Sequence, residues 1–131
     1  MIINIFSLNK IFLFYIEKLM GWLYLIKEEN VCDGNRYKIG VTSEKDANKR
    51  LKKLQTGNPN KLSFLGVFET KYPYKLESIM HGQYSDKNIL GEWYELDDED
   101  IIKFVPLCER FNKIIESLND NPFFNNKAKI I

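Results

Sequence analysis

The sequence predicts one small α+β domain whose elements follow the order strand, strand, helix, strand, helix. Three observations lead to this prediction. The chain has 131 residues, which is the size of a single domain, and 44% of them are hydrophobic, enough for one packed core. Short apolar and aromatic runs typical of strands alternate with segments that carry helix signals. No internal repeat appears, so we expect residues 20–118 to form the domain.

Two strands open the predicted domain. Residues 22–27 form a short run rich in the residue types that favour strands. The pair Asp33-Gly34 signals a turn, and residues 36–42 form the second run. We expect the two strands to pair as an antiparallel hairpin.

A basic helix follows the second strand. Ser43 is a suitable N-cap, and the helix is predicted to continue to about Leu54. Its apolar residues are spaced four and three apart, which gives one narrow apolar stripe, and its other faces carry lysine and arginine. Gly57 and Pro59 are predicted to end the helix.

The next two elements are a third strand over residues 62–70 and a second helix over residues 74–84. We expect the third strand to join the first two in one antiparallel sheet. Glu77 and His81 stand four positions apart on the second helix, so the sequence places them on the same helix face.

The C-terminal part is predicted to begin with a short strand or edge segment over residues 91–96. The acidic run that follows suits the first turn of another helix, and Pro106 is expected to interrupt that helix near its middle. Residues 119–131 lack a periodic pattern and are predicted to form a tail.

Residues 1–19 are expected to be an N-terminal extension that packs little against the domain. The segment is apolar but interrupted by polar residues, and it is too short and too polar to span a bilayer comfortably. It also lacks the small-residue cleavage site of a signal peptide. Met20 suits a natural start, and an amphipathic membrane-associating helix is the less favoured interpretation. We therefore expect no stable membrane association.

The two cysteines, Cys32 and Cys108, lie far apart and have no cysteine or histidine partner at metal-ligand spacing. A zinc site is therefore not expected, and two free thiols favour an intracellular location.

Charge is distributed unevenly, although the net charge is only +1. Residues 36–61 contain eight basic residues and two acidic ones, a local net charge of +6. Residues 92–100 contain six acidic residues and no basic one. The whole-chain charge argues neither for nor against nucleic acid, whereas a basic middle and an acidic patch predict a polarised surface.

Six short motifs then occur in an order and at a spacing typical of one family. They are "GWLYLI", "YKIGVT", "KRLKKLQTGNP", "LGVFET", "LESIMHGQY" and "GEWYEL", spread over residues 20–96. On these motifs the chain resembles the GIY-YIG superfamily of nucleases. It resembles more closely the branch described as a bacteriophage DNA-binding domain or as the type of meiotically up-regulated gene 113. The resemblance implies a three-stranded antiparallel sheet flanked by helices, with the active site on one side of the sheet. It also implies hydrolysis of a DNA phosphodiester with one divalent metal ion, Mg²⁺ or Mn²⁺.

The resemblance also implies roles for individual residues in the two strand motifs. Tyr24 matches the tyrosine of the first motif. In the second motif the place of the tyrosine is taken by Lys38, and Tyr37 stands one residue further out. Lysine at this place is typical of the branch, so the exchange does not by itself imply an inactive site.

The helical motifs carry the remaining matches. Arg50 matches the motif arginine, and Glu77 matches the glutamate that holds the metal. His81 matches the histidine that this branch carries one turn later. Glu92, in "GEWY", matches a further signature of the branch that has no assigned role.

The residue types agree with phosphodiester cleavage, which requires an activated water and neutralisation of charge on the phosphoryl oxygens. A carboxylate such as Glu77 holds a divalent ion, and the guanidinium of Arg50 suits a phosphate. Tyr24 and Lys38 suit proton transfer or phosphate contact. Sequence-independent phosphate contacts are expected from the basic helix. Its residues in this role are Lys49, Arg50, Lys52 and Lys53.

Two further function classes stay open from the sequence. One is a DNA-binding module on the same fold with weak or lost catalysis, because Lys38 replaces the second tyrosine. The other is a small scaffold protein that uses its C-terminal helix as an interface. Each site residue also has an ordinary structural interpretation: Tyr24 as a core aromatic, and Arg50 and Glu77 as surface residues of helices.

Overall fold

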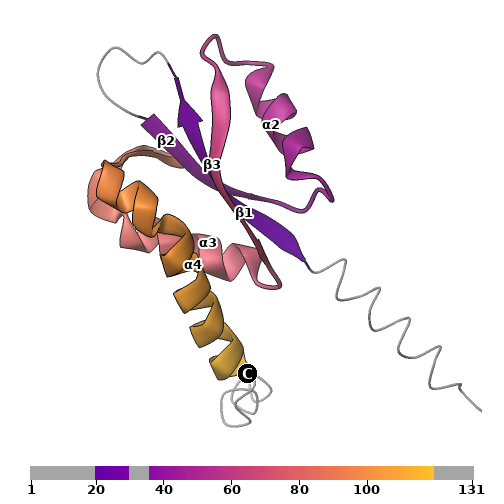
Figure 1. Cartoon of the computed structure of the whole chain (residues 1–131), viewed down its shortest axis with the longest axis vertical. Helices are drawn as coiled ribbons and strands as arrows, with labels where there is room; N and C mark the ends of the chain where they lie inside the picture. The colour runs from indigo at the N-terminus through magenta and orange to yellow at the C-terminus, as the bar shows by residue number, and fades with distance from the viewer. Residues whose placement is uncertain (1–19, 30–35, 120–131) are drawn as a thin grey trace, which may run out of the picture.

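The computed structural model of the chain describes residues 20–29 and 36–119 (Figure 1). Cys32, the predicted Asp33-Gly34 turn and the predicted extension over residues 1–19 lie outside the described residues. So does the predicted tail, apart from Asn119, which ends the last helix.

One antiparallel sheet of five strands organises the domain, in the order β3-β1-β2-β5-β4. The strands are β1 (Gly21–Glu28), β2 (Arg36–Thr42), β3 (Leu62–Thr70), β4 (Asn88–Leu90) and β5 (Trp93–Glu95). The expected hairpin of β1 and β2 and their common antiparallel sheet with β3 are confirmed. The expectation of three strands is wrong, because β4 and β5 extend the sheet beyond β2. Strand β5 lies within the short strand or edge segment predicted over residues 91–96, so that prediction is confirmed. Strand β4 was not predicted, because its three residues are too few to show an alternating pattern.

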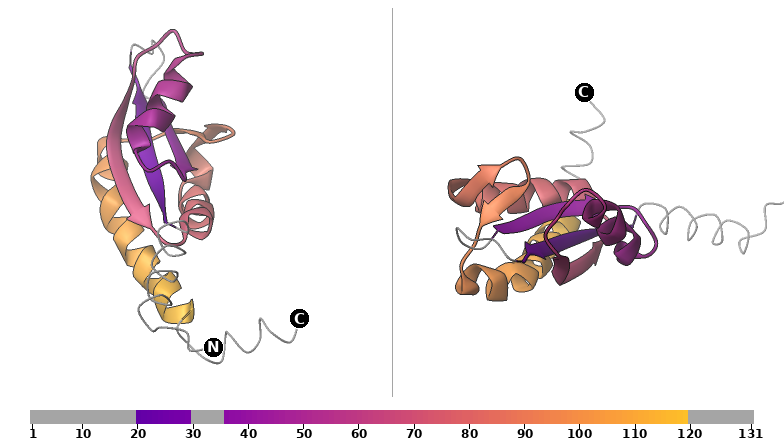
Figure 2. Two further views of the ribbon diagram at one scale, coloured as in Figure 1. Left: turned by 90° about the vertical axis from the view of Figure 1, so that its right-hand side faces the viewer. Right: turned by 90° about the horizontal axis from the view of Figure 1, so that it is seen from above.

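In the described part of the chain, three α-helices pack around the sheet, α2 (Ala47–Gln55), α3 (Pro73–Gln83) and α4 (Asp98–Asn119), and a short 3-10 helix, η1 (Ser85–Lys87), precedes β4. Figure 2 shows α2 and α4 on opposite sides of the strands. The side chains of β1 alternate between the two sides. Leu23 and Leu25 pack with residues of α3 and α4, whereas Tyr24 and Ile26 pack with residues of α2. The central strand is therefore buried on both faces, as its continuous apolar run requires.

The same alternation on β2 positions the site. Tyr37 and Ile39 are buried in the cluster shared with α3 and α4. Lys38 and Gly40 therefore face the other side, the side of Tyr24. The register agrees, because Tyr24 pairs with Gly40 and Lys38 pairs with Trp93 of β5.

Two predicted helix features are wrong. The N-cap of α2 is Asp46 and not Ser43, because Asp46 Oδ1 accepts a hydrogen bond from the Asn48 backbone N–H at 2.9 Å. Helix α4 also continues unbroken through Pro106. Proline has no backbone N–H, so the carbonyl of Ile102 lacks the hydrogen bond that residue 106 would otherwise donate. Both Pro106 and Ile102 lie on the exposed side of α4. Water can therefore hydrate that carbonyl.

The acidic start of α4 is confirmed as its first turn. Asp97 and Asp100 cap it reciprocally: the Asp100 N–H donates to Asp97 Oδ1 at 2.8 Å, and the Asp97 N–H donates to Asp100 Oδ2 at 3.1 Å. Cys108 of α4 is a free, buried thiol, and burial raises its pKa to about 12. In residues 20–29 and 36–119, no helix is both long and apolar enough to cross a membrane.

Candidate metal and nucleic-acid site

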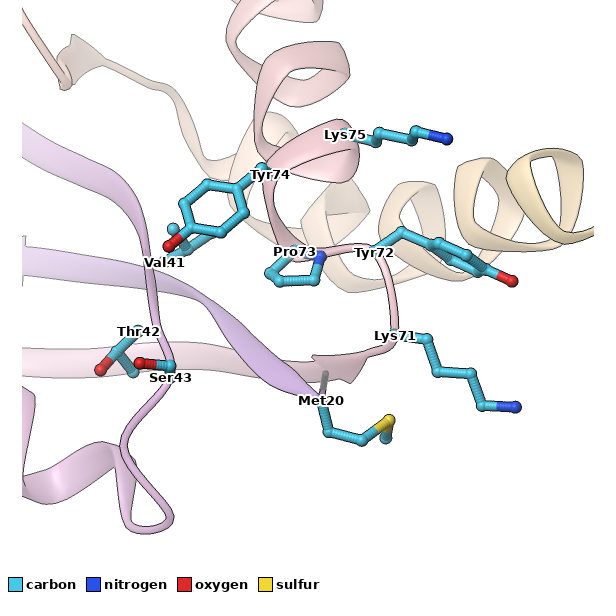
Figure 3. A pocket seen from close by; sticks show the side chains of 9 residues that line it. All are labelled: Met20, Val41, Thr42, Ser43, Lys71, Tyr72, Pro73, Tyr74 and Lys75. Carbon is cyan, nitrogen blue, oxygen red and sulfur yellow. The ribbon is translucent and has the colours of Figure 1, made fainter. Parts of the chain in front are cut away.

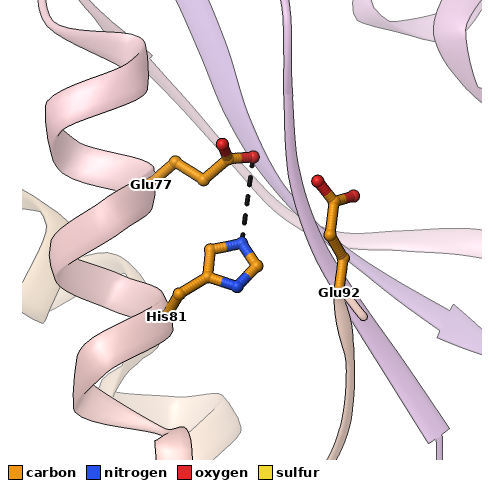
Figure 4. A group of neighbouring side chains, drawn as sticks. All are labelled: Glu77, His81 and Glu92. Carbon is orange, nitrogen blue, oxygen red and sulfur yellow. Dashed lines mark ion pairs between the residues drawn. The ribbon is translucent and has the colours of Figure 1, made fainter. Parts of the chain in front are cut away.

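Three ligand-type side chains meet beside β2. Glu77 and His81 project from α3 toward Glu92, as Figure 4 shows, and each offers a ligand atom within 4.8 Å of the others. The spacing of four residues places Glu77 and His81 on one face of α3. Glu92 directly follows Gly91, whose φ of 56° turns the chain in a conformation that suits glycine. The Ile39 N–H donates to the Glu92 carbonyl at 3.0 Å and fixes this turn against β2.

Tyr94 orients the imidazole of His81. The His81 Nδ1 and the Tyr94 hydroxyl form a hydrogen bond, and the two rings meet edge to face with centroids 5.4 Å apart. This contact turns Nε2 toward Glu77, whose Oε2 lies 3.8 Å away. Nε2 is buried and has no hydrogen-bond partner within the described part of the chain. The ring nitrogen is therefore held toward the carboxylates without a close hydrogen bond.

The surroundings of Glu77 disfavour its charged form. Burial, and then the negative charge of Glu92, raise the pKa of Glu77, whereas His81 and Lys38 act in the opposite direction. Burial is also the main cause that raises the pKa of Tyr94, and Glu92 and Glu77 add to it. Tyr94 therefore stays a neutral phenol near pH 7. The site has an excess of negative charge that a cation would offset.

Lys38 faces the side of the sheet that carries Tyr24, and its side chain reaches Glu92. Its Nζ lies 2.8 Å from Glu92 Oε2 and 5.7 Å from the centre of the Trp93 ring. Only 13% of the Lys38 side chain is exposed, and 41% of the Glu92 side chain. Lys38 is thus a largely buried ammonium held by one carboxylate and one aromatic ring.

Tyr24 lies across Gly40 on this face. A Cβ atom at Gly40 would lie 2.7 Å from Cζ and 2.9 Å from Cε2 of the Tyr24 ring, and closer still to its hydroxyl. Glycine at position 40 therefore makes the room that the ring of Tyr24 occupies. The Tyr24 hydroxyl is buried and has no hydrogen-bond partner among residues 20–29 and 36–119. Lys38, two residues before Gly40 on β2, faces the same side of the sheet as this hydroxyl.

The basic helix α2 covers the same face. Leu51 and Leu54 pack on the cluster that contains Tyr24. The neighbouring Arg50 has a buried Nε that no hydrogen-bond acceptor of the described residues contacts. Lys49 and Lys52 are exposed, whereas Lys53 is paired with Glu44.

The family of the chain follows from a comparison with family models. The model of the T5orf172 domain matches residues 21–109, from the first residue of β1 into α4. The chain belongs to the T5orf172 domain family. This is a phage-type domain related to the GIY-YIG-like nuclease fold. Neither the curated proteins nor the solved structures contain a significant match to the chain.

Within this T5orf172 domain, the structure gathers Lys38, Glu77, His81 and Glu92 directly, and it places Tyr24 and Arg50 on the same side of the sheet. It does not bring Tyr37 to them. Tyr37 is buried in the opposite cluster, and burial is the main cause that raises its pKa.

Two site residues were not identified from the sequence. Tyr94, which holds His81, and Trp93, which contacts Lys38, both lie in the quoted motif "GEWYEL". Their roles depend on the pairing of β5 with β2, and no spacing in the sequence indicates that pairing.

Proposed function

We propose that this T5orf172 domain is a metal-dependent DNA endonuclease that hydrolyses phosphodiester bonds. The observation that carries the proposal has two parts: Glu77, His81 and Glu92 form a ligand cluster, and Lys38, which pairs with Glu92, faces the same side of the sheet as Tyr24, whose buried hydroxyl has no hydrogen-bond partner in the described structure. Buried polar atoms usually have partners, so such a hydroxyl on the face that Lys38 links to a ligand cluster suggests a group kept for substrate or water.

The donor set fits a divalent ion. With bonds of about 2.1 Å, adjacent ligands of an octahedral ion lie about 3.0 Å apart and opposite ones about 4.2 Å, so the three atoms, within 4.8 Å of one another, would have to move closer together on binding. For His81 Nε2 to be a ligand, Nδ1–H has to donate to the Tyr94 hydroxyl, which is the usual outer contact of a ligand histidine. When bound, the ion would polarise the phosphoryl group and make a bound water more acidic. An imidazole ligand favours Mn²⁺ over Mg²⁺.

The protein's own residues supply the rest of the chemistry in this proposal. After giving its own proton to solvent, Tyr24 orients the attacking water as a phenolate and takes its proton, which restores the phenol, while the departing alkoxide is protonated by solvent. The Arg50 guanidinium binds the phosphate and stabilises the charge that grows on its oxygens. Lys38 adds a second positive charge at the same face and keeps Glu92 in place. The exposed lysines of α2 make sequence-independent contacts with the DNA backbone.

One observation favours a second candidate, a DNA-binding module without cleavage. The Lys38 ammonium occupies an oxygen of Glu92 at 2.8 Å, and an ammonium there competes with a metal ion for that carboxylate. In that case Glu92 would serve to hold Lys38 for phosphate contact.

Relaxation and linearisation of supercoiled plasmid separate the two candidates. We expect the wild-type protein to cleave with Mn²⁺ or Mg²⁺ and not with a chelator. Tyr24→Phe should lower the cleavage rate by about 10²- to 10⁴-fold, the usual contribution of a general acid or base. It should not lower the melting temperature, because the deleted hydroxyl has no hydrogen bond in the described structure.

Tyr84→Phe is the matched control. Tyr84 is also buried, and its hydroxyl also lacks a hydrogen-bond partner in the described structure, but it packs against Phe104 in the cluster on the other face. Its loss should leave cleavage unchanged. A wild-type protein that binds DNA and cleaves no substrate with either metal would show the endonuclease proposal to be wrong and favour the binding module.

A further inference from the structure

A cavity of about 430 Å³ lies where the start of β1, the end of β2 and the start of α3 meet (Figure 3). Its lining is mainly apolar and includes Met20, Val41 and Pro73. Pro73 packs closely on the strands, since a Cβ at Gly21 would lie 3.0 Å from the Pro73 ring and 3.2 Å from the Thr42 carbonyl oxygen. The volume lies within the range of cavities that hold small organic groups.

Two elements connect this cavity with the metal and tyrosine site. On α3, Tyr74 precedes Glu77 by three residues and His81 by seven, so the three side chains share one helix face. The rise from Tyr74 to Glu77 along the helix is only about 4.5 Å. On β2, Thr42 follows Lys38 and Gly40 on the same face of the strand, and it lines the cavity together with Val41 from the other face. The cavity therefore continues the surface that carries the site.

The cavity combines an aromatic ring with positive charge. Tyr74 is 72% exposed, and in Figure 3 its ring stands over Val41. The ring therefore offers an open apolar face at one end of the cavity. Lys71 and Lys75 line the other end of the same cavity, and both are exposed, with the Lys75 ammonium 3.4 Å from Asn119 Oδ1. A ligand that suits this place has a flat apolar face and a negative charge some way from that face.

We propose that this cavity receives one unstacked base of a DNA strand, next to the phosphate that the metal and tyrosine site acts on. Tyr74 is the stacking surface for the base, and Lys71 and Lys75, whose side chains extend away from Tyr74 beyond Pro73 (Figure 3), contact phosphates farther along the strand. The inference rests on the proposed DNA substrate and adds a preference among DNA structures. A base within an intact duplex is stacked on its neighbours and cannot enter the cavity. The preferred substrate is therefore DNA with a gap, a flap or another single-stranded position.

The test measures binding without cleavage, using the full chain and a chelator in place of metal. Fluorescence anisotropy compares an intact duplex with the same duplex carrying a short single-stranded gap. We expect the wild-type protein to bind the gapped DNA more tightly. Tyr74→Ala should weaken binding to gapped DNA about 5- to 150-fold, the range found when a stacking aromatic is removed, and leave duplex binding unchanged. Tyr74→Trp should retain the preference.

An abasic scan locates the base. Bases are removed one at a time from the gap. At one position the loss of the base should weaken DNA binding by the wild-type protein. At that same position it should not further weaken DNA binding by Tyr74→Ala. Ile102→Ala is the control for exposure, because Ile102 is 75% exposed and lies on α4, outside the cavity. Lys71→Ala and Lys75→Ala should each reduce the salt dependence of binding to gapped DNA.

Three results would overturn the inference. One is equal affinity of the wild-type protein for gapped and intact DNA, and another is a gap preference that Tyr74→Ala leaves intact. The third is tight competition by a free deoxynucleoside monophosphate without any gap preference, which would make the cavity a site for small nucleotides. A failure of the endonuclease proposal alone would give a different result. The protein would still prefer gapped DNA in the presence of the chelator, but it would not cleave DNA when metal is added.

Discussion

At the scale of a single residue, the charge of Glu77 destabilises the folded protein, and a bound metal ion would offset that cost. Burial and Glu92 raise its pKa above the usual 4.5, so the folded protein holds a proton on Glu77 more tightly than the unfolded chain does. Between pH 4.5 and the raised pKa, the folded state therefore binds more protons, and stability falls as the pH rises. Above the raised pKa the full cost of the charged carboxylate is present, unless a metal ion offsets it.

Glu77→Gln removes that charge. We expect the variant to have a higher melting temperature than the wild type near pH 7 without metal, and a smaller decline in stability as the pH rises from 4.5. Mn²⁺ should raise the melting temperature of the wild type, since a ligand that binds only the folded state stabilises it, and should not raise that of the variant. The measurement is thermal unfolding across pH, with and without Mn²⁺.

Glu99→Gln makes the same chemical change on the exposed first turn of α4, where Glu99 pairs with Lys103. It should leave both the pH dependence and the response to Mn²⁺ as in the wild type. An equal gain from Mn²⁺ in the wild type and in Glu77→Gln would exclude Glu77 as a metal ligand.

At the scale of elements, helix α4 contains a proline that it does not need for its shape. Pro106 removes one backbone hydrogen bond, and its ring crowds the carbonyl of Ile102. Pro106→Ala should restore that bond and stabilise the protein by about 1–3 kcal/mol, measured by urea unfolding. Glu109→Ala, at another exposed position of α4, should change stability by less than about 0.5 kcal/mol. A destabilised Pro106→Ala protein would mean that the proline packs favourably where it stands.

The elements also show what the sequence can predict. Strands β2 and β3 have the predicted bounds, because apolar and aromatic runs with turn signals on both sides define them. The sequence did not predict the pairing of β4 with β5. A strand of three residues is recognised by the strands it pairs with, since it is too short for an alternating pattern of apolar and polar residues. Pro106 was expected to break α4, because a sequence does not tell whether water can reach the carbonyl that a proline leaves unbonded.

Some residues of the candidate site could be brought together from the sequence, and others could not. Glu77 and His81 share a face through a local spacing of four, so the sequence was sufficient to join them. Glu92 lies far along the chain and reaches them through the turn at Gly91 and the pairing of β5 with β2. Tyr37 and Lys38 are neighbours in sequence, but their side chains lie on opposite faces of the sheet because side chains alternate along a strand. The Tyr94 contact with His81 depends on tertiary packing alone.

At the scale of the whole molecule, positive and negative charge occupy different regions. Exposed lysines lie on α2, which covers the face with Tyr24, and the acids that begin α4 lie across the sheet from it (Figure 1). Lys87 pairs with Asp97 at 3.7 Å and with Asp100 at 2.5 Å, so part of the acidic charge is neutralised within the domain. DNA should therefore approach the α2 side and avoid the start of α4.

Replacing Lys49 and Lys52 together by alanine tests this orientation. Each phosphate contact contributes about 0.9 to the slope of log affinity against log salt concentration for duplex DNA. The double variant should therefore bind more weakly at low salt and have a slope smaller in magnitude by up to about 1.8. Its cleavage rate with saturating DNA and metal should equal that of the wild type, because both lysines contact the DNA backbone and neither is proposed to act on the phosphate that is cleaved. Lys103→Ala removes an equally exposed charge that pairs with Glu99 on α4 and should leave the slope unchanged. If Lys103→Ala lowers the slope and the double variant does not, DNA lies on the α4 side, and the α2 face is not the binding surface.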